Sequence, residues 1–496
     1  MAASSRKKSS ATSAPRSASG ATPKSAAPAE LTSATRPSAA MTKMPSAAVS
    51  TMARKRRSMV RGFASFFDLS QGGRSAWGGK RPGREGCAPP EGEREAAPMA
   101  EAILVFNAGS SSIKFALYEI DASGSLSPHL HGLIEGIGAA PHLLVRNRLG
   151  QVAHEQFWPV GAALTHEDLL TPLLELIEAE GGEDRIRAVS HRIVHGGARH
   201  FRPVRIDPEL LAELDALTPL APLHQPHNLA PVRAIAALRP GLAQIACFDT
   251  AFHRSMPLRA ERFPLPRALF DQGIRRYGFH GISYEYVSRR LYDLDREAAR
   301  GRVIAAHLGN GASLCAMEEG RSVDTTMGFT ALDGLMMGTR SGSIDPGVVI
   351  DLIRRFHHTP DSVEDLLYRH SGLLGVSEIS ADMRTLLASS DPRAAEAIAL
   401  FVYRAAREMG GLIAVLGGVD AIVFTGGVGE HAAPVRAAIM GYFEWLGVRL
   451  DTAANAASQT LISAPESRVK VFVIPTDEER MLAEHALECL AGPVGS

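Results

Sequence analysis

The sequence predicts an α/β fold made of two related domains that face a shared cleft. Two loops far apart in the chain combine glycine with hydroxyl or amide side chains, NAGSSSIK at residues 107–114 and HLGNGAS at residues 307–313. Each is followed by an apolar strand that runs into paired glycines, at residues 189–197 and 421–429. Any one of these pieces alone would read as an ordinary turn. Because loop and strand recur in the same order, the pattern indicates a duplicated domain.

The first loop is predicted to bind phosphate. It lies between two short apolar runs, residues 103–106 and 115–118, and therefore reads as the tip of a strand–loop–strand hairpin. Glycine lets the backbone approach an anion closely, and the serine hydroxyls add hydrogen-bond donors. Lys114 supplies a positive charge at the end of the loop. This chemistry is suited to a nucleotide.

The C-terminal part of the chain shows strands alternating with helices. An Asp-Pro pair at residues 391–392 opens a long apolar-periodic segment, which predicts a helix with an Asp cap and Pro in its first turn. After a strand at residues 469–474, Thr476 and Glu479 have the spacing of a capping box, and the last helix runs to about Leu490. Alternation of this kind predicts α/β architecture with ligands bound at strand ends.

Charge is distributed unevenly along the chain. The 496 residues, of which 45% are apolar, suffice for at least two domains with hydrophobic cores. Residues 1–98 contain 17 Lys and Arg and 6 Asp and Glu, which leaves 36 and 47 in the remainder and makes that remainder acidic. Nucleic acid is therefore not an expected partner of the folded part, because binding a phosphate backbone requires a basic face.

Cysteine usage and hydropathy point to a cytoplasmic protein without a membrane span. The 4 cysteines lie far apart and form no Cys-x-x-Cys motif, so neither a zinc site nor a disulfide framework is expected. A reducing cytoplasm fits this usage. The apolar stretch at residues 409–419 is only 11 residues long and is too short to span a bilayer, which takes about 20 residues.

Residues 1–98 are expected to be disordered, because they are rich in Ser, Ala, Pro, Arg and Lys and have few large apolar side chains. Such a composition also describes an organelle transit peptide. The favoured interpretation is a spurious or dispensable extension, since Met99 stands four residues before the first strand and would serve as a start.

Five motifs in one order resemble the acetate kinase family. They are NAGSSSIK (107–114), HRIVHGG (191–197), FDTAFH (248–253), YGFHG (277–281) and MGTRSG (337–342). The resemblance runs from residue 103 to about residue 490. It implies the duplicated actin-like ATPase (ribonuclease H-like) fold, usually as a homodimer. The implied lobes are residues 99–250, joined by the C-terminal helix 479–496, and the nucleotide-binding residues 251–478.

By this resemblance the protein transfers the γ-phosphate of ATP to acetate, reversibly and with Mg²⁺ or Mn²⁺, giving ADP and acetyl phosphate. Arg192 matches the arginine that holds the substrate, and a guanidinium suits a carboxylate. His280 and Arg340 match the residues that stabilise the transition state. Asp249 matches a residue described as an acid or base. Since a carboxylate acceptor has no proton to lose, we expect Asp249 to orient an arginine or the magnesium shell.

Two further sets of site residues follow from the resemblance. Asn107 and Glu478 match magnesium-site residues, although an acidic residue in the first turn of a helix is favourable without any metal. The nucleotide-contacting positions are Lys114, His307, Leu308, Gly309, Asn310, Gly311, Asp382, Met383, Arg384, Gly427, Val428, Gly429, Glu430 and His431.

The acid-binding pocket is expected to be small and apolar, because acetate offers only a methyl group for shape recognition. Val194, Leu223 and Phe279 match three of its walls, and Ala331 replaces a proline as the fourth. A wider pocket and measurable propionate turnover are therefore expected. The other departures from the family pattern are Gln225 for Asn, Tyr284 for His, Ser343 for Asp and His431 for Asn.

Three other functions remain open from the sequence. A propionate or butyrate kinase would use the same chemistry with a larger pocket. An actin-like ATPase that acts as a scaffold or chaperone would not need paired arginines directed at a carboxylate. A sugar kinase would need an aspartate base for a hydroxyl nucleophile and polar pocket walls, which the apolar pocket disfavours.

Overall fold

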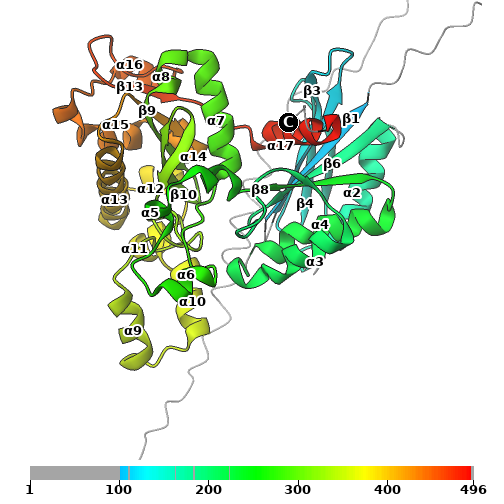
Figure 1. The fold of residues 1–496 in the computed structure, drawn as a ribbon, viewed down its shortest axis with the longest axis horizontal. Coiled ribbons are helices and arrows are strands. Elements are labelled where there is room, and N and C mark those ends of the chain that lie inside the picture. The colour runs from blue at the N-terminus through cyan, green and yellow to red at the C-terminus, as the bar shows by residue number, and fades with distance from the viewer. Residues whose placement is uncertain (1–100, 110–111, 162–163, 182–184, 223, 493–496) are drawn as a thin grey trace, which may run out of the picture. The chain divides into compact units, whose positions relative to one another are not determined.

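The computed structural model describes residues 101–109, 112–161, 164–181, 185–222 and 224–492. The expected disorder of residues 1–98 and the predicted pocket residue Leu223 both lie outside these ranges. Within them the chain forms an α/β structure with two sheets, which confirms the predicted fold class. Figure 1 shows the two sheets, each with its own covering helices.

The first sheet contains eight strands among the described residues, in the order β5-β4-β3-β2-β1-β6-β8-β7. Its strands are β1 (Ala102–Ala108), β2 (Ser112–Ile120), β3 (Leu126–Glu135), β4 (His142–Asn147), β5 (Val152–Phe157), β6 (Ile186–Ile193), β7 (Val204–Arg205) and β8 (Ala243–Phe248). The predicted hairpin around the first loop is formed by β1 and β2, with Asn107 paired opposite Lys114.

The second sheet contains five strands in the described ranges, in the order β11-β10-β9-β12-β13. Its strands are β9 (Arg302–Leu308), β10 (Ala312–Glu318), β11 (Arg321–Thr325), β12 (Ala421–Thr425) and β13 (Lys470–Val473). The second predicted loop is the tip of the β9–β10 hairpin, and it therefore occupies the same place in this sheet as the first loop does in the other.

The pairing of the strands confirms the duplication. In the first sheet β1 is antiparallel to β2 and parallel to β6, which is parallel to β8. In the second sheet β9 is antiparallel to β10 and parallel to β12, which is parallel to β13. The segment β3-β2-β1-β6-β8 thus has the same order and directions as β11-β10-β9-β12-β13. The two glycine loops therefore join equivalent strands, β1 to β2 in the first sheet and β9 to β10 in the second.

Helices cover both faces of each sheet. On the first sheet, α2 (His166–Gly181) and α4 (Gln225–Leu238) pack against one face, whereas α17 (Glu478–Ala491) packs against the other. Adjacent residues of a strand point to opposite faces of the sheet. In β1, Leu104 packs in the core on the α2 side, and Ile103 packs in the core on the α17 side. The last helix of the chain therefore completes the core around the first strand.

The second sheet is covered in the same way. Helix α13 (Pro392–Leu416) and α15 (Ala433–Gly441) pack on one face, and α7 (Gly281–Leu294) with α8 (Arg296–Arg300) packs on the other. The remaining helices are α3 (Pro208–Ala216), α5 (Leu258–Glu261), α6 (Arg267–Asp271), α9 (Pro346–Arg354), α10 (Pro360–Arg369), α11 (Gly372–Ser377), α12 (Met383–Leu387), α14 (Gly426–His431) and α16 (Thr452–Ala456). Among the residues described, none of the helices combines the length and hydrophobicity needed to cross a bilayer.

One predicted helix cap is confirmed and one is wrong. Asp391 caps α13 by accepting a hydrogen bond from the Arg393 N–H, with Pro392 in the first turn as expected. At α17 the cap is Asp477, which accepts from the Arg480 N–H at 2.9 Å, and not Thr476. The helix starts one residue later than predicted, because both residues are good caps and the Thr476 hydroxyl is bound elsewhere.

The buried face of β1 should carry much of the stability of the first sheet. Leu104 is fully buried, so Leu104→Ala should lower the free energy of unfolding by about 2–5 kcal/mol through lost burial and an unfilled cavity. Leu149→Ala, at a side chain that is 72% exposed, is the matched control and should change stability by less than about 0.5 kcal/mol. Urea unfolding measures both, and equal losses would contradict this assignment of the core.

Candidate active site

A buried ion pair lies where two parallel strands of the first sheet end. Arg192 is near the end of β6, and Asp249 directly follows β8, so the parallel pairing of these strands brings the two side chains to the same edge. The Arg192 Nε–H donates to both Asp249 carboxylate oxygens at 3.1 and 3.0 Å, and Nη2 donates to the same carboxylate. Burial raises the pKa of Asp249, and the charge of Arg192 opposes that rise.

Asn107 connects this pair to the beginning of the last helix. Its side-chain oxygen accepts from Arg192 Nη1 at 3.2 Å. Its amide nitrogen donates to Glu478 at 3.0 Å and to Glu479 at 3.3 Å. Both predicted metal-site residues, Asn107 and Glu478, are thus in contact, although they are 371 residues apart in the chain.

The carboxylates around Asn107 are not fully neutralised by neighbouring cations. Burial would raise the pKa of Glu478, but the charges of Arg192, His307 and Lys114 outweigh it, and the net shift is downward. For Glu479, burial and the adjacent Glu478 raise the pKa. Three acidic side chains here face two permanent cations, Arg192 and Lys114, so the site has room for additional positive charge.

This donor set fits a hydrated Mg²⁺ ion. Mg²⁺ usually keeps several waters and binds through one or two carboxylates together with substrate phosphates. Glu478 and Glu479 offer such carboxylates, whereas the Asn107 oxygen faces Arg192. In the described part of the chain, no group of three or more His, Cys, Asp or Glu side chains could hold a metal ion by itself. The arrangement therefore suits a cation that arrives with a phosphate ligand.

Arg340 is a partly buried cation that contacts only neutral groups. Its Nη1 donates to the Ala331 carbonyl at 3.1 Å, and its Nη2 donates to His224 Nε2 at 3.3 Å. Among the residues described, no carboxylate pairs with it. Burial and the nearby charge of Arg192 lower the pKa of Arg340. The two predicted arginines are therefore close enough to repel one another, which favours an anion between them.

His224 also belongs to the site, although no motif in the sequence indicates it. Burial and then the charges of Arg340 and Arg192 lower its pKa to about 3, so at neutral pH it is uncharged and accepts the arginine N–H. Glu479 was likewise given only a capping role. Glu479 contacts Asn107, which is 372 residues away in the sequence. The run of three acidic residues at 477–479 is the one sequence feature that could have indicated its place in the site.

His280 is held in an unusual backbone conformation next to these arginines. It precedes α7 with φ of 61°, in the left-handed region that favours glycine. The Gly281 N–H donates to the Asp249 carbonyl at 2.8 Å, and a side chain at Gly281 would place its Cβ 2.2 Å from that oxygen. Burial first, and then the charges of His307, Arg192 and Arg340, lower the pKa of His280 well below its usual value. Its ring is therefore neutral.

The predicted apolar pocket residues share one hydrophobic cluster. Val194 and Phe279 are buried in it, at 3% and 1% exposure, and the partly buried Ala331 packs against it. Since the Ala331 carbonyl also accepts from Arg340, this apolar surface adjoins the guanidinium group. A small side chain at residue 331 leaves room that a proline ring would fill.

Three of the predicted nucleotide segments line one cavity of about 510 Å³. The predicted residues on its wall are Gly309, Asn310, Asp382, Met383, Arg384, Gly427, Val428 and His431. Leu308 and Gly429 are buried behind that wall, and Glu430 accepts hydrogen bonds from the N–H groups of Gly426 and Thr476. His307, Gly311 and Lys114 lie nearer the carboxylates and arginines. The β9–β10 loop thus contributes Gly309 and Asn310 to the cavity wall and places Gly311 beside His280 and Arg340.

Two departures from the family pattern are structural substitutions. Gln225 is fully buried and donates to the carbonyls of His195 and Leu214, at 3.2 and 3.1 Å, and its own oxygen has no partner among the described residues. Ser343 donates to Asp333 at 2.5 Å. His431 is largely exposed at the edge of the nucleotide cavity. Within the described ranges, none of these three side chains hydrogen-bonds to Arg192 or Arg340.

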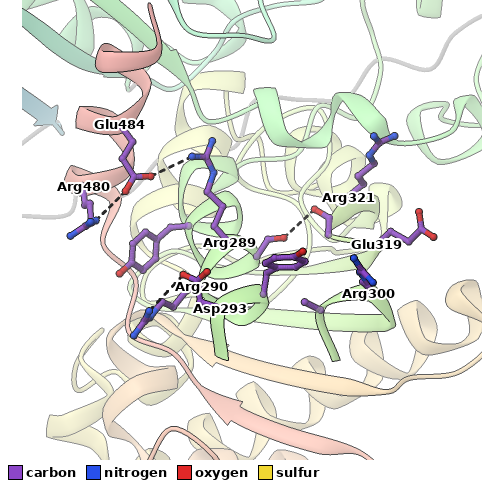
Figure 2. A pocket seen from close by; sticks show the side chains of 13 residues that line it. Arg289, Arg290, Asp293, Arg300, Glu319, Arg321, Arg480 and Glu484 are labelled. Carbon is purple, nitrogen blue, oxygen red and sulfur yellow. Dashed lines mark hydrogen bonds and ion pairs between the residues drawn. The ribbon is translucent and has the colours of Figure 1, made fainter. Parts of the chain in front are cut away.

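A larger cavity, of about 1,110 Å³, lies beside α7 and the beginning of α17 (Figure 2). Its walls carry the arginines Arg289, Arg290, Arg300, Arg321 and Arg480. Glu484 pairs with Arg289 at 3.3 Å and with Arg480 at 3.0 Å, and Asp293 pairs with Arg290 at 3.7 Å. Three of these five arginines are thus paired with carboxylates of the lining, and none of the predicted site residues reaches this cavity.

Comparison with known proteins agrees with this geometry. The family model described as the acetokinase family matches residues 102–484. An acetate kinase from Rhodopseudomonas palustris is 55% identical over 392 residues, covering 78% of this chain and 98% of that protein. The crystal structure of Porphyromonas gingivalis acetate kinase has a TM-score of 0.71 at 37% identity, covering 79% of this chain and 100% of that one. A propionate kinase from Francisella tularensis has a TM-score of 0.72 at 36% identity, covering 78% and 98%. With the family model matching far more than half of its length, the chain belongs to the acetokinase family.

Proposed function

We propose that this protein transfers the γ-phosphate of ATP to acetate, forming acetyl phosphate and ADP, and that it also runs the reverse reaction. The observation that carries the proposal is the pair Arg192 and Arg340 beside a small apolar surface and the β9–β10 phosphate loop. Two guanidinium groups beside apolar walls suit a short carboxylate and the phosphoryl group that it attacks. Acetate kinases among the relatives support the choice of acid.

Arg192 retains two N–H groups for a ligand. A guanidinium has five N–H donors, of which one on Nε and one on Nη2 bind Asp249 and one on Nη1 binds Asn107. One N–H remains on each of Nη1 and Nη2. These N–H groups are left on the terminal nitrogens of the guanidinium fork, which suits a carboxylate or a phosphate. Asp249 thus acts by fixing the orientation of this fork, and no proton transfer is required of it.

Arg340 and His280 stabilise the phosphoryl group during transfer. Charge is spread over three equatorial oxygens in such a transition state, and little covalent work is needed from the protein. Arg340 has no carboxylate partner in the described residues and can therefore place its full charge on those oxygens. His280, being neutral, contributes a hydrogen bond without adding repulsion between cations.

Mg²⁺ would be held by Glu478 and Glu479 with water and the ATP phosphates, and it would neutralise phosphate charge. Mn²⁺ has the same preference for oxygen ligands. Lys114 and His307 would contact the phosphate chain, and the cavity at Asp382–Arg384 and Gly427–His431 would hold the nucleoside. We infer that residues 99–250 with the last helix form one lobe and residues 251–478 the other, with the reaction between them.

A homodimer is also proposed, with α9 in the interface. This helix has no buried residue, and its apolar side chains Val348, Ile350 and Ile353 are 40 to 49% exposed, as is Phe356 just beyond it at 58%. A solvent-facing apolar helix of this kind is stabilised when a second copy covers it. A cytoplasmic location is proposed because Cys247, Cys315 and Cys489 are all free thiols.

Hydroxylamine trapping tests the reaction, the acid and the metal together. The assay contains ATP and Mg²⁺ and is run with acetate, propionate or butyrate. We expect hydroxamate to form fastest with acetate and more slowly with the longer acids. No hydroxamate should form when EDTA is added. Because Ala331 widens the pocket, the acetate to propionate ratio of kcat/KM should stay below about 100-fold.

Two outcomes of that experiment would change the assignment. A higher kcat/KM for propionate than for acetate would make the protein a propionate kinase. ADP release that does not depend on added acid, with no hydroxamate, would indicate an ATPase that drives conformational change.

Asp249→Asn should separate an orienting role from a chemical one. We expect kcat/KM to fall by about 100-fold or more, with an increase in the KM for acetate, because the Arg192 fork loses its anchor. Asp215→Asn, which breaks an exposed Arg–Asp pair with Arg233, is the control and should change kcat/KM by less than about twofold. A large loss of kcat at an unchanged KM for acetate would argue for a chemical role of Asp249.

The proposed interface can be tested by light scattering coupled to size exclusion. The molar mass measured by light scattering should be twice the 52.9 kDa of one chain. Ile350→Asp should shift it toward the monomer, since a charge cannot be buried without a partner. Val160→Asp, at a residue that is 89% exposed, should leave the mass unchanged. A monomeric protein before mutation, or a dimer that survives Ile350→Asp, would contradict the assignment of α9.

A further inference from the structure

A chain of hydroxyl groups contacts the Nδ1 atom of His280, the ring nitrogen other than the one near Gly311. Ser313, on β10, lies 2.8 Å from His280 Nδ1 through its Oγ atom. The Tyr284 hydroxyl, on α7, lies 2.5 Å from the same Ser313 oxygen. Tyr284 and Ser313 are both fully buried, so bulk water does not compete for these contacts.

The direction of these hydrogen bonds follows from the number of protons. Among the described residues, the Tyr284 hydroxyl can donate a hydrogen bond only to Ser313. If Ser313 donated to it, the phenol proton would be left without an acceptor among these residues, in a fully buried place. Buried donors are almost always paired. Tyr284 therefore donates to Ser313, and Ser313 donates to His280 Nδ1.

This direction fixes the tautomer of His280. A neutral imidazole carries one proton, and a nitrogen that accepts a hydrogen bond cannot carry it. Because Nδ1 accepts from Ser313, the proton of His280 is on Nε2. Burial also raises the pKa of Tyr284 well above its usual value, so the phenol keeps the proton that it donates.

The Nε2 atom of His280 faces the phosphate loop. A Cβ atom on Gly311 would lie 3.2 Å from His280 Nε2 and 4.0 Å from Arg340 Nη1, which places both donors against the same glycine. Within the described ranges, His280 Nε2 has no protein acceptor. Its N–H can therefore donate to a ligand beside Gly311, where Nη1 of Arg340 also lies.

The neighbouring ring of His307 is also bound at Nδ1 by a chain of two hydroxyl groups. Its Nδ1 lies 2.8 Å from the Ser283 hydroxyl, which in turn lies 2.9 Å from the Thr476 hydroxyl. The rings of His280 and His307 stack with centroids 4.2 Å apart and planes 22° apart. Both rings thus have Nδ1 held by a buried serine, although this second chain can run in either direction.

We propose that Tyr284 and Ser313 are positioning residues that hold His280 in its Nε2–H tautomer, so that this N–H donates to an oxygen of the transferred phosphoryl group. The inference rests on the proposed function and assigns a role to Tyr284, whose family counterpart is usually a histidine. The Tyr284 phenol can only donate to Ser313 here. A histidine at this position could either donate to Ser313 or accept from it, so it would not fix the direction of the hydrogen bond from Ser313 to His280.

Neutron diffraction of the deuterium-exchanged protein tests the tautomer without any activity measurement. We expect nuclear density for deuterium on His280 Nε2, on Ser313 Oγ toward His280 and on the Tyr284 oxygen toward Ser313. Deuterium on His280 Nδ1 would overturn the proposal. This result does not depend on which acid the enzyme uses, so it stays informative if the hydroxylamine assay fails.

Kinetics of Tyr284→Phe, Ser313→Ala and the double variant test the role. Ser313→Ala should lower kcat by roughly 10- to 100-fold, because a misplaced proton removes one donor to the transition state. Tyr284→Phe should lower kcat by roughly 3- to 10-fold, since Ser313 is no longer forced to donate to the ring. The KM values for acetate and ATP should stay within about twofold in both, because the pocket walls are unchanged.

The double variant distinguishes positioning from general damage to the core. If Tyr284 acts through Ser313, the double variant should be no slower than Ser313→Ala alone. Losses of kcat that multiply would overturn the relay. Tyr277→Phe is the matched control, because it removes another buried phenol, which donates to the Gly273 carbonyl at 2.9 Å outside the relay. A kcat for Tyr277→Phe as low as that of Tyr284→Phe would show that losing any buried hydroxyl has the same effect.

Discussion

The contact between Arg192 and Asp249 is the interaction on which the candidate site depends. It joins the ends of β6 and β8, and through Asn107 it reaches β1 and the first turn of α17. Four elements thus meet around one guanidinium group. A buried arginine with a carboxylate on one edge keeps its charge and a fixed orientation, whereas an unpaired one would be costly to bury. This packing leaves N–H groups of Arg192 without a partner among the described residues.

Much of the fold could be predicted because its signals are local and occur twice. The loops at residues 107–114 and 307–313 share composition, and their strands pair in the same order in both sheets. The cap of α13 was likewise readable from an Asp-Pro pair. The cap of α17 was placed at Thr476 because local sequence does not reveal that the Thr476 hydroxyl bonds to Ser283, a residue of another helix.

The site was predictable to the extent that its motifs are contiguous. Arg192, Asp249, His280 and Arg340 each lie in a short contiguous motif, and the structure brings them together. Residues whose role depends on distant contacts could not be found this way. Glu479 and His224 acquire theirs from Asn107 and Arg340, and the Tyr284–Ser313 contact joins a helix to a strand. Burial and hydrogen-bond direction, which decide these roles, are properties of the folded chain only.

The position of α17 has a consequence for how the protein is made. Glu478 and Glu479 belong to the last helix of the described chain, yet they contact Asn107 on the first strand. A growing polypeptide emerges from the ribosome with its first strand long before these carboxylates exist. Nascent chains that end before residue 478 therefore lack two of the three carboxylates of the centre, Glu478 and Glu479, and have only Asp249.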